Sequence, residues 1–298
     1  MRPASFLLLV TPLTLARAGI TPRASYADVT VSLRKDLLSD WYSDIDSDDS
    51  DIEGPNDPAG FYSCVGPMIE DYPQKNEWLS FKTMWAINEP DITLANGGDS
   101  YNTHLREAIE EISVKSKVDA RLILTLVLQE VWHRSLTFWV ISTANKVESS
   151  GNMSIGCTGK TDCGILQHRG SRKFDRNQPK QSITNMLIDG IYGTAPNPAP
   201  GTPYGWPGYL HLFNGFQEGL EWLGDAQFWR GNPYAAGHLY NAGSIGSENL
   251  TTMDGGVERS RYYANDMVSR LQGWNGRGEG CLKSRQCRAH GFEGRVCY

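Results

Sequence analysis

The feature that most constrains the fold is a short segment that is apolar around its whole circumference. Residues 120–130 read ARLILTLVLQE, in which most positions carry apolar side chains. Asp119 precedes this stretch and is a suitable N-cap, because its carboxylate can accept hydrogen bonds from the first backbone N–H groups. A helix that is apolar on all sides must be covered by other elements. The segment therefore predicts a central buried helix that ends in a carboxylate, Glu130.

The remaining sequence predicts a mainly α-helical domain. Apolar residues recur at helical spacing, as Leu105, Ile109 and Ile112 do within residues 101–116. Similar patterns predict further helices over residues 182–192, 213–228, 235–240 and 259–272. The sequence lacks alternating apolar runs long enough to build a large sheet, so the fold class that we predict is mainly α.

The N-terminal part of the chain differs in composition from the rest. An apolar run from Phe6 to Val10, followed by small residues up to Ala18, is typical of a secretory signal peptide. Residues 19–60 are polar and acidic, and repulsion among their aspartates predicts a flexible, disordered linker. We therefore expect a secreted, extracellular protein. Its predicted segments are a signal peptide at 1–18, the acidic linker at 19–60, a folded domain at 61–275 and a cysteine-rich tail at 276–298.

Cysteine usage and net charge narrow the functional classes. Six cysteines in a chain with an export signal predict disulfides, and the close spacing of Cys157 and Cys163 predicts that these two close their own loop. Whether Cys64 pairs with a cysteine of the tail stays open. The formal net charge of −6 argues against nucleic-acid binding, and the N-terminal apolar run is too short to span a membrane. We expect a monomer with no cofactor, no metal ion and no membrane partner.

Glu130 is the first candidate for chemistry. Apolar surroundings disfavour the charged form of a carboxyl group and raise its pKa, so such a group keeps a proton to donate. The alternative is that Glu130 merely ends a helix in solvent. A second glutamate, Glu148, complicates the choice, because deleting either residues 131–148 or residues 130–147 yields the same string, LQESSGN.

Three short motifs carry a resemblance to a known family. The string LQESSGN resembles the first motif of the lysozyme-like lytic transglycosylases, a superfamily that includes soluble lytic transglycosylases and goose-type lysozymes. Gly164-Ile165-Leu166-Gln167 is similar to the Gly-Leu-Met-Gln of the second motif, and Tyr240-Asn241-Ala242-Gly243 matches the third. All three follow in family order between residues 101 and 273, and the chain is most similar to secreted fungal members. The resemblance implies a lysozyme-like α-helical (α+β) domain.

The resemblance also implies an activity and a set of site residues. It implies a secreted enzyme that cleaves β-1,4 bonds of peptidoglycan, or of a chitin-type polymer behind it, with a single catalytic glutamate. That glutamate acts first as acid and then as base, while the 6-hydroxyl of the sugar closes an anhydro ring. The implied residues are Glu130 (alternatively Glu148) as the catalytic group, Gly164 close to the ligand, Gln167 bonding the sugar, Tyr240 orienting the glutamate or the ring, and Asn241 holding an N-acetyl group.

The chain departs from the family at the interruption VWHRSLTFWVISTANKV, residues 131–147. One hypothesis is a retained intron, because Val131 must begin with GT, and Ala144-Asn145 and Val147-Glu148 can encode branch and acceptor signals. The rival hypothesis is a genuine insertion, such as a surface loop. Sequencing the transcript distinguishes the two. If the segment is real protein, we prefer Glu130, because burial against the helix is what tunes a carboxyl group.

Two further alternatives concern the chemistry itself. Asp162 is the best candidate for a second carboxylate, although its position before Cys163-Gly164 favours an interpretation as a turn residue. Trp206 could stack on sugars, and His168 is interpreted as a neighbour of the second motif and not as a base. The alternative to an enzyme is a catalytically inactive secreted protein that binds sugars or interacts with a host.

Overall fold

The computed structural model describes residues 63–130, 151–158, 160–194, 206–215, 229–257, 260–276 and 295–296. The predicted signal peptide, the acidic linker and the interruption at 131–147 lie outside the described residues. So do Glu148 and nearly all of the cysteine-rich tail. What the sequence predicts for these segments therefore stays a prediction.

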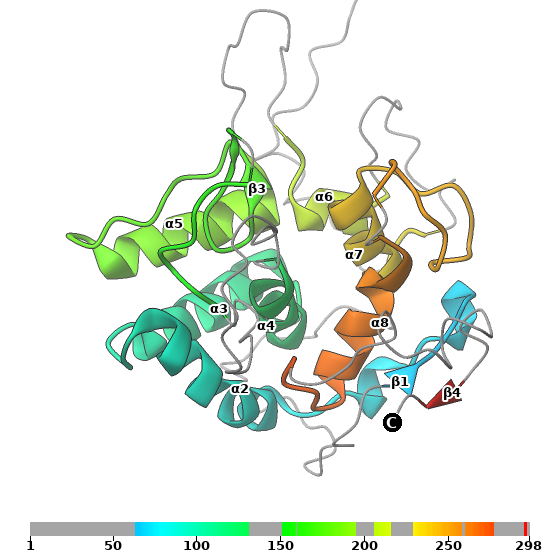
Figure 1. Ribbon diagram of the computed structural model, residues 1–298, viewed down its shortest axis with the longest axis horizontal. Coiled ribbons are helices and arrows are strands. Elements are labelled where there is room, and N and C mark those ends of the chain that lie inside the picture. Colours follow the sequence, from blue (N-terminus) through cyan, green and yellow to red (C-terminus); the bar gives the residue numbers. More distant parts are fainter. Residues whose placement is uncertain are drawn as a thin grey trace, which may run out of the picture.

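The described part of the chain is mainly helical, as predicted. Its helices are α2 (Phe81–Asn96), α3 (Asn102–Ser116), α4 (Ala120–Gln129), α5 (Pro179–Tyr192), α6 (Tyr209–Phe213), α7 (Pro233–Ala242) and α8 (Ser260–Leu271), with short 3-10 turns at Ile69–Asp71 and Lys75–Glu77. Two small antiparallel pairs complete it: β1 (Ser63–Cys64) with β4 (Arg295–Val296), and β2 (Asp162–Cys163) with β3 (His168–Arg169). Helix α4 lies between the group formed by α2, α3 and α5 and the group formed by α6, α7 and α8 (Figure 1). None of the helices in these ranges combines the length and the apolar character that crossing a membrane requires.

Helix α4 is the central element that the sequence predicts. All of its residues from Ala120 to Gln129 are buried, and it packs against α2, α3 and α8. Asp119 is its N-cap and accepts a hydrogen bond from Arg121 N at 2.9 Å. The same carboxylate holds the Arg121 guanidinium, with 2.7 Å between Nη2 and Oδ2, and that guanidinium lies 4.9 Å from the centre of the Trp78 ring. The pair is almost fully buried, so it belongs to the core.

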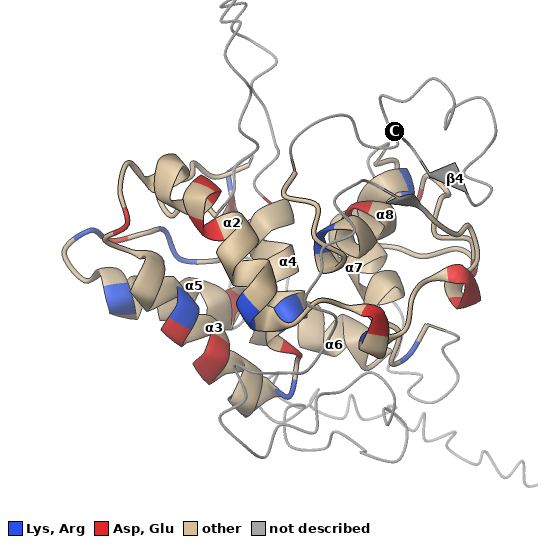
Figure 2. Cartoon of the chain, turned by 90° about the horizontal axis from the view of Figure 1, so that it is seen from below, with Lys and Arg blue, Asp and Glu red and all other residues tan. Residues whose placement is uncertain are grey.

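The surface of the first helical group is a solvated polar face. Charges of both signs are interspersed along α3 and α5 (Figure 2). Lys180 Nζ of α5 lies 2.8 Å from Glu107 Oε2 of α3, and Arg106 Nε lies 2.9 Å from Glu110 Oε1 one turn further along α3. Exposed pairs of this kind contribute little to stability. The buried faces, and not these charges, therefore hold α3 against α5.

One local prediction differs from the structure, and one helix was not predicted. The helix predicted over residues 213–228 is wrong at its start, because α6 ends at Phe213, where Asn214 Nδ2 caps the Leu210 carbonyl at 2.6 Å and Gly215 turns the chain with φ +88°. Residues 216–228 lie outside the described ranges. Helix α2 has no counterpart among the predicted helices, and it contains Pro90, which lacks the N–H that continues a helix. Its packing against α3 and α4 outweighs that local signal.

Candidate active site

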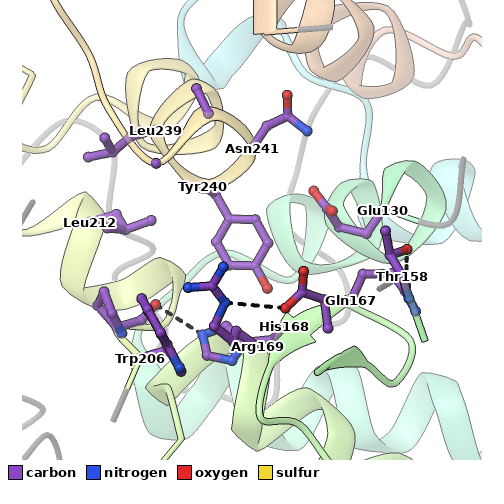
Figure 3. A pocket seen from close by; sticks show the side chains of 14 residues that line it. Glu130, Thr158, Gln167, His168, Arg169, Trp206, Leu212, Leu239, Tyr240 and Asn241 are labelled. Carbon is purple, nitrogen blue, oxygen red and sulfur yellow. Dashed lines mark hydrogen bonds and ion pairs between the residues drawn. The ribbon is translucent and has the colours of Figure 1, made fainter. Parts of the chain in front are cut away.

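One cavity of about 320 Å³ brings together residues from four separate parts of the chain. They come from the end of α4, the β2–β3 hairpin, the segment that leads into α6, and the end of α7 (Figure 3). The lining residues are Glu130, Thr158, Asp162, Gln167, His168, Arg169, Trp206, Pro207, Leu212, Leu239, Tyr240, Asn241, Ala242 and Gly243. The size is at the lower end for small-molecule pockets. Residues from all three family-like motifs line this cavity.

Glu130 is positioned by the end of α4. It is the C-cap of that helix, and its backbone N–H donates to Leu126 O at 3.0 Å. The carboxylate is partly buried and Oε1 accepts a hydrogen bond from the Tyr263 hydroxyl. The C-terminal end of a helix carries partial negative charge and disfavours an anion. A carboxyl group held at this end is therefore not explained as a helix-stabilising device.

Tyr263 is the site residue that the sequence does not reveal. It belongs to α8, is fully buried, and reaches Glu130 across the α4–α8 contact. Its backbone carbonyl also accepts a hydrogen bond from Gln129 Nε2 at 2.9 Å. Tyr263 therefore joins α8 to two consecutive residues at the end of α4, Gln129 and Glu130. The helix predicted over 259–272 includes Tyr263, but nothing in its spacing shows which neighbour it meets.

The β2–β3 hairpin forms the polar wall of the cavity. The predicted disulfide between Cys157 and Cys163 is present and closes this loop, with an S–S distance of 2.01 Å. Gln167 has φ +45°, and its amide is fully used inside the loop: Nε2 donates to the carbonyls of Gly156 (3.3 Å) and Gly164 (2.8 Å), and Oε1 accepts from Thr158 N (2.9 Å) and Oγ1 (2.6 Å). The expectation that this amide bonds a sugar is corrected: Gln167 shapes the wall.

Gly164 supports the hairpin from behind the cavity wall, and its predicted role of keeping the turn close to a ligand stays a prediction. It does not belong to the cavity lining. Its φ is +73°, and a Cβ at this position would lie 2.8 Å from Ser171 Oγ and 2.9 Å from Arg172 O. Glycine is therefore required to pack the hairpin against the following loop. Its carbonyl also accepts from Gln167 N at 3.0 Å, so it helps to hold that residue.

Tyr240 crosses the cavity wall from the end of α7. Its hydroxyl donates to Leu166 O at 3.0 Å, so it fastens the hairpin to α7, whereas the direct bond to Glu130 comes from Tyr263. Burial raises the pKa of the Tyr240 phenol well above its usual value, and the charges of Glu130 and Asp162 raise it further. The phenol consequently stays protonated. Its ring lies between Glu130 and Arg169 in Figure 3.

Asn241 places a hydrogen-bond acceptor, its side-chain oxygen, on the cavity wall. Its Oδ1 is buried and has no hydrogen-bond partner within the described ranges. A buried amide oxygen without a donor is costly, so such an atom is a natural place for a ligand N–H or O–H to bind. Asn241 lies beside Tyr240 on the cavity wall, facing the side from which Glu130 enters (Figure 3).

Asp162 and Arg169 face each other across the hairpin. They are register partners in β2 and β3, with 3.4 Å between Arg169 Nε and Asp162 Oδ1. The Arg169 guanidinium also lies 3.9 Å from the centre of the Trp206 ring. The favoured interpretation of Asp162 as a turn residue is therefore wrong, because the residue belongs to a strand and lines the cavity. Trp206 lines it too, with one ring face covered by the guanidinium.

His168 lines the cavity as a neutral, packed residue. Burial lowers the pKa of its imidazole, and Nε2 lies 3.0 Å from Pro207 O, which identifies Nε2 as the protonated nitrogen. This bond ties β3 to the segment before α6. A neutral imidazole in this role agrees with the interpretation of His168 as a neighbour of the motif.

The described residues that follow the interruption begin at Gly151, which lies against α4. Gly151 has φ +76°, and a Cβ placed on it would lie 3.5 Å from Val127 Cγ1 of α4. Asn96 of α2 holds this segment, because its Nδ2 donates to Gly151 O at 2.9 Å and its Oδ1 accepts from Met153 N at 2.8 Å. Gly151 of the first motif thus lies beside the helix that ends in Glu130. The choice of Glu130 over Glu148 stays a prediction, because Glu148 is not described.

Neither a family model nor a curated protein nor a solved structure matches this chain. The resemblance to lysozyme-like lytic transglycosylases therefore rests on the three motifs alone. Across the described ranges, no group of three or more His, Cys, Asp or Glu side chains is placed to hold a metal ion.

Proposed function

We propose that this protein is a secreted enzyme of lysozyme-like fold that cleaves β-1,4 bonds of an N-acetylated glycan, with Glu130 as the acid. Peptidoglycan is the first substrate to test and chitin-type polymers are the second. One observation carries the proposal. Glu130, Gln167 and the Tyr240-Asn241 pair are far apart in the sequence, yet all of them line one cavity.

The arrangement supports acid chemistry at Glu130. Cleaving a glycosidic bond requires a proton for the leaving oxygen and stabilisation of the positive sugar ring left behind. Glu130 enters the cavity from a rigid buried helix, and the Tyr263 hydroxyl fixes the direction of its carboxyl group. A group held in this way loses little freedom when substrate binds, which favours catalysis by orientation.

The rest of the wall supports recognition of an acetylated sugar. The unpartnered Oδ1 of Asn241 can accept the N–H of an acetamido group or a sugar hydroxyl. Leu212, Leu239 and Pro207 supply apolar surface for a methyl group or a ring face. Gln167 contributes indirectly, since its four hydrogen bonds keep the hairpin in the shape that the cavity needs.

A second candidate function is a sugar-binding protein that has lost catalysis. It is favoured by one observation: the interruption begins at the residue after Glu130, where a displacement of the carboxyl group would abolish activity. Such a protein would bind the glycan without cleaving it.

The test compares the wild-type chain with Glu130→Gln in clearing a suspension of purified peptidoglycan. We expect Glu130→Gln to reduce the rate at least about 100-fold, because it removes the proton that the leaving oxygen takes. Glu70→Gln is the matched control, since Glu70 is exposed and lies outside the cavity, and it should clear at the wild-type rate. Equal clearing by Glu130→Gln would remove this residue from the mechanism. Binding without clearing by the wild type would favour the sugar-binding alternative.

A further inference from the structure

An arginine on the cavity wall has hydrogen-bond donors that the described part of the protein does not use. Arg169 of β3 lines the cavity that Glu130 enters, and its side chain is 48% exposed and lies between Trp206 and Gln167 in Figure 3. Its Nε faces Asp162 Oδ1 at 3.4 Å, whereas no described residue accepts a hydrogen bond from its terminal nitrogens, Nη1 and Nη2. A guanidinium has five N–H donors, all but one of them on these two nitrogens. Arg169 therefore keeps its terminal edge for a ligand.

A second arginine, in the loop that follows β3, shows what a purely structural arginine looks like in this protein. The Arg172 side chain is 51% exposed, about as much as that of Arg169. Its guanidinium is nevertheless well bonded, because Nε donates to Asp189 Oδ2 at 2.9 Å and Nη2 donates to Asp189 Oδ1 and to Asn185 O. It does not line the cavity. The two arginines thus differ in bonding and in position, and not in their exposure to solvent.

Protein contacts hold the Arg169 guanidinium in place. Its Cζ lies 3.9 Å from the centre of the Trp206 ring, which attracts a cation over its face. The disulfide between Cys157 and Cys163 closes the loop of this hairpin, and the Tyr240 hydroxyl ties the hairpin to α7. A side chain that is held in this way loses little conformational freedom when a ligand binds, and this favours affinity.

The surroundings of Arg169 carry a local excess of positive charge. The whole chain has a formal net charge of −6, but residues 157–176 contain five basic residues against two acidic ones. All five basic side chains are exposed: Lys160, Arg169, Arg172, Lys173 and Arg176. Asp162 offsets part of the Arg169 charge, but it faces the Nε side of the guanidinium. This side of the cavity therefore favours an anionic ligand over a neutral one.

Of the two substrates that the proposed function names, only one offers such an anion. The peptides that peptidoglycan carries contain carboxylates that are ionised at neutral pH, whereas an N-acetylated polymer of the chitin type is neutral. A guanidinium can bind a carboxylate through two parallel N–H···O bonds. We propose that Arg169 binds a carboxylate of these peptides, so that the cavity selects peptidoglycan over a neutral polymer of the chitin type. The inference rests on the proposed function.

The test compares two forms of one substrate. The first is a soluble, peptide-bearing oligomer of peptidoglycan, and the second is the same oligomer with its carboxyl groups converted to methylamides. We expect the wild type to lose about 10- to 100-fold in kcat/KM on the amidated oligomer, because a hydrogen bond to a charged group contributes a factor of this size. Arg169→Gln should lose the same factor on the unmodified oligomer and should cleave the two oligomers equally well.

Arg106→Gln is the matched control. Arg106 also faces a carboxylate through its Nε, that of Glu110, but it belongs to α3 and lies outside the cavity. This variant should match the wild type on both oligomers. If Arg169→Gln instead loses the same factor on both oligomers, the two changes are independent, Arg169 has a structural role only, and the proposal is overturned.

The wild type by itself tests the ligand, whether or not the Arg169 variant folds. Equal cleavage of the unmodified and the amidated oligomer by the wild type would overturn the role of Arg169 and leave the proposed function standing. A wild type that cleaves neither oligomer would overturn both.

Discussion

Helix α4 begins and ends in a carboxylate, and the two ends differ in every other respect. Asp119 caps the N-terminal end, where the helix dipole favours an anion, and it is fully buried against Arg121 under the Trp78 ring. Glu130 caps the C-terminal end, where the dipole disfavours an anion, and it lines a cavity. The comparison teaches that one residue class serves stability where the helix dipole favours its charge, and that at the other end, where the dipole disfavours it, the carboxyl group is left for the chemistry that we propose.

The largest effect on stability is expected at the N-terminal end of helix α4, where Asp119 is the cap. Asp119→Ala removes one partner of a buried ion pair together with a helix cap, and it leaves the Arg121 charge buried and unpaired. We expect a loss of about 3–5 kcal/mol in the free energy of unfolding. Urea denaturation followed by circular dichroism measures it. A loss below about 1 kcal/mol, the size of an exposed pair, would contradict the distinction between the two ends.

A smaller, matched effect is expected when one buried tyrosine hydroxyl is removed from α8 or from α7. Tyr263→Phe deletes the bond to Glu130, and Tyr234→Phe deletes the bonds of a buried hydroxyl to Pro73 O (2.8 Å) and Trp78 Nε1 (2.7 Å). Tyr234→Phe leaves the buried Trp78 Nε1 without an acceptor, and Tyr263→Phe leaves the partly buried Glu130 carboxylate without a donor, so each should lose about 1–3 kcal/mol of unfolding free energy. Only Tyr263→Phe should also slow glycan cleavage by the folded protein. Equal cleavage rates in the two variants would show that Tyr263 does not position the acid.

The smallest effect on stability is expected at Glu130 itself. Glu130→Gln keeps the shape of the side chain and removes a charge from the end of the helix that disfavours it. The free energy of unfolding should therefore change by less than about 1 kcal/mol. The same urea titration used for Asp119→Ala measures it. A loss as large as that of Asp119→Ala would mean that Glu130 is part of the core and would remove the contrast.

Local signals in the sequence predicted the parts of the fold that depend on neighbours along the chain. Helix α4 and its Asp119 cap, the disulfide between Cys157 and Cys163, and most other helices follow from apolar spacing, capping and short loop closure. The sequence did not predict helix α2, because Pro90 is a local signal against a helix. It did not predict the end of α6 at Phe213, because the turn there depends on the Asn214 side chain.

The sequence by itself determined that a buried helix ends in Glu130 and that three motifs follow one another in a mainly helical chain. Only the tertiary structure decided what meets what: that Tyr263 bonds Glu130, that the Gln167 amide is used within its own loop, and that Arg169 joins Asp162 to Trp206. The physical reason is that hydrogen-bond partners and charge pairs form between side chains that the packing of helices brings together. Spacing along the chain records which face of a helix is buried, but not which residue of another helix lies against it.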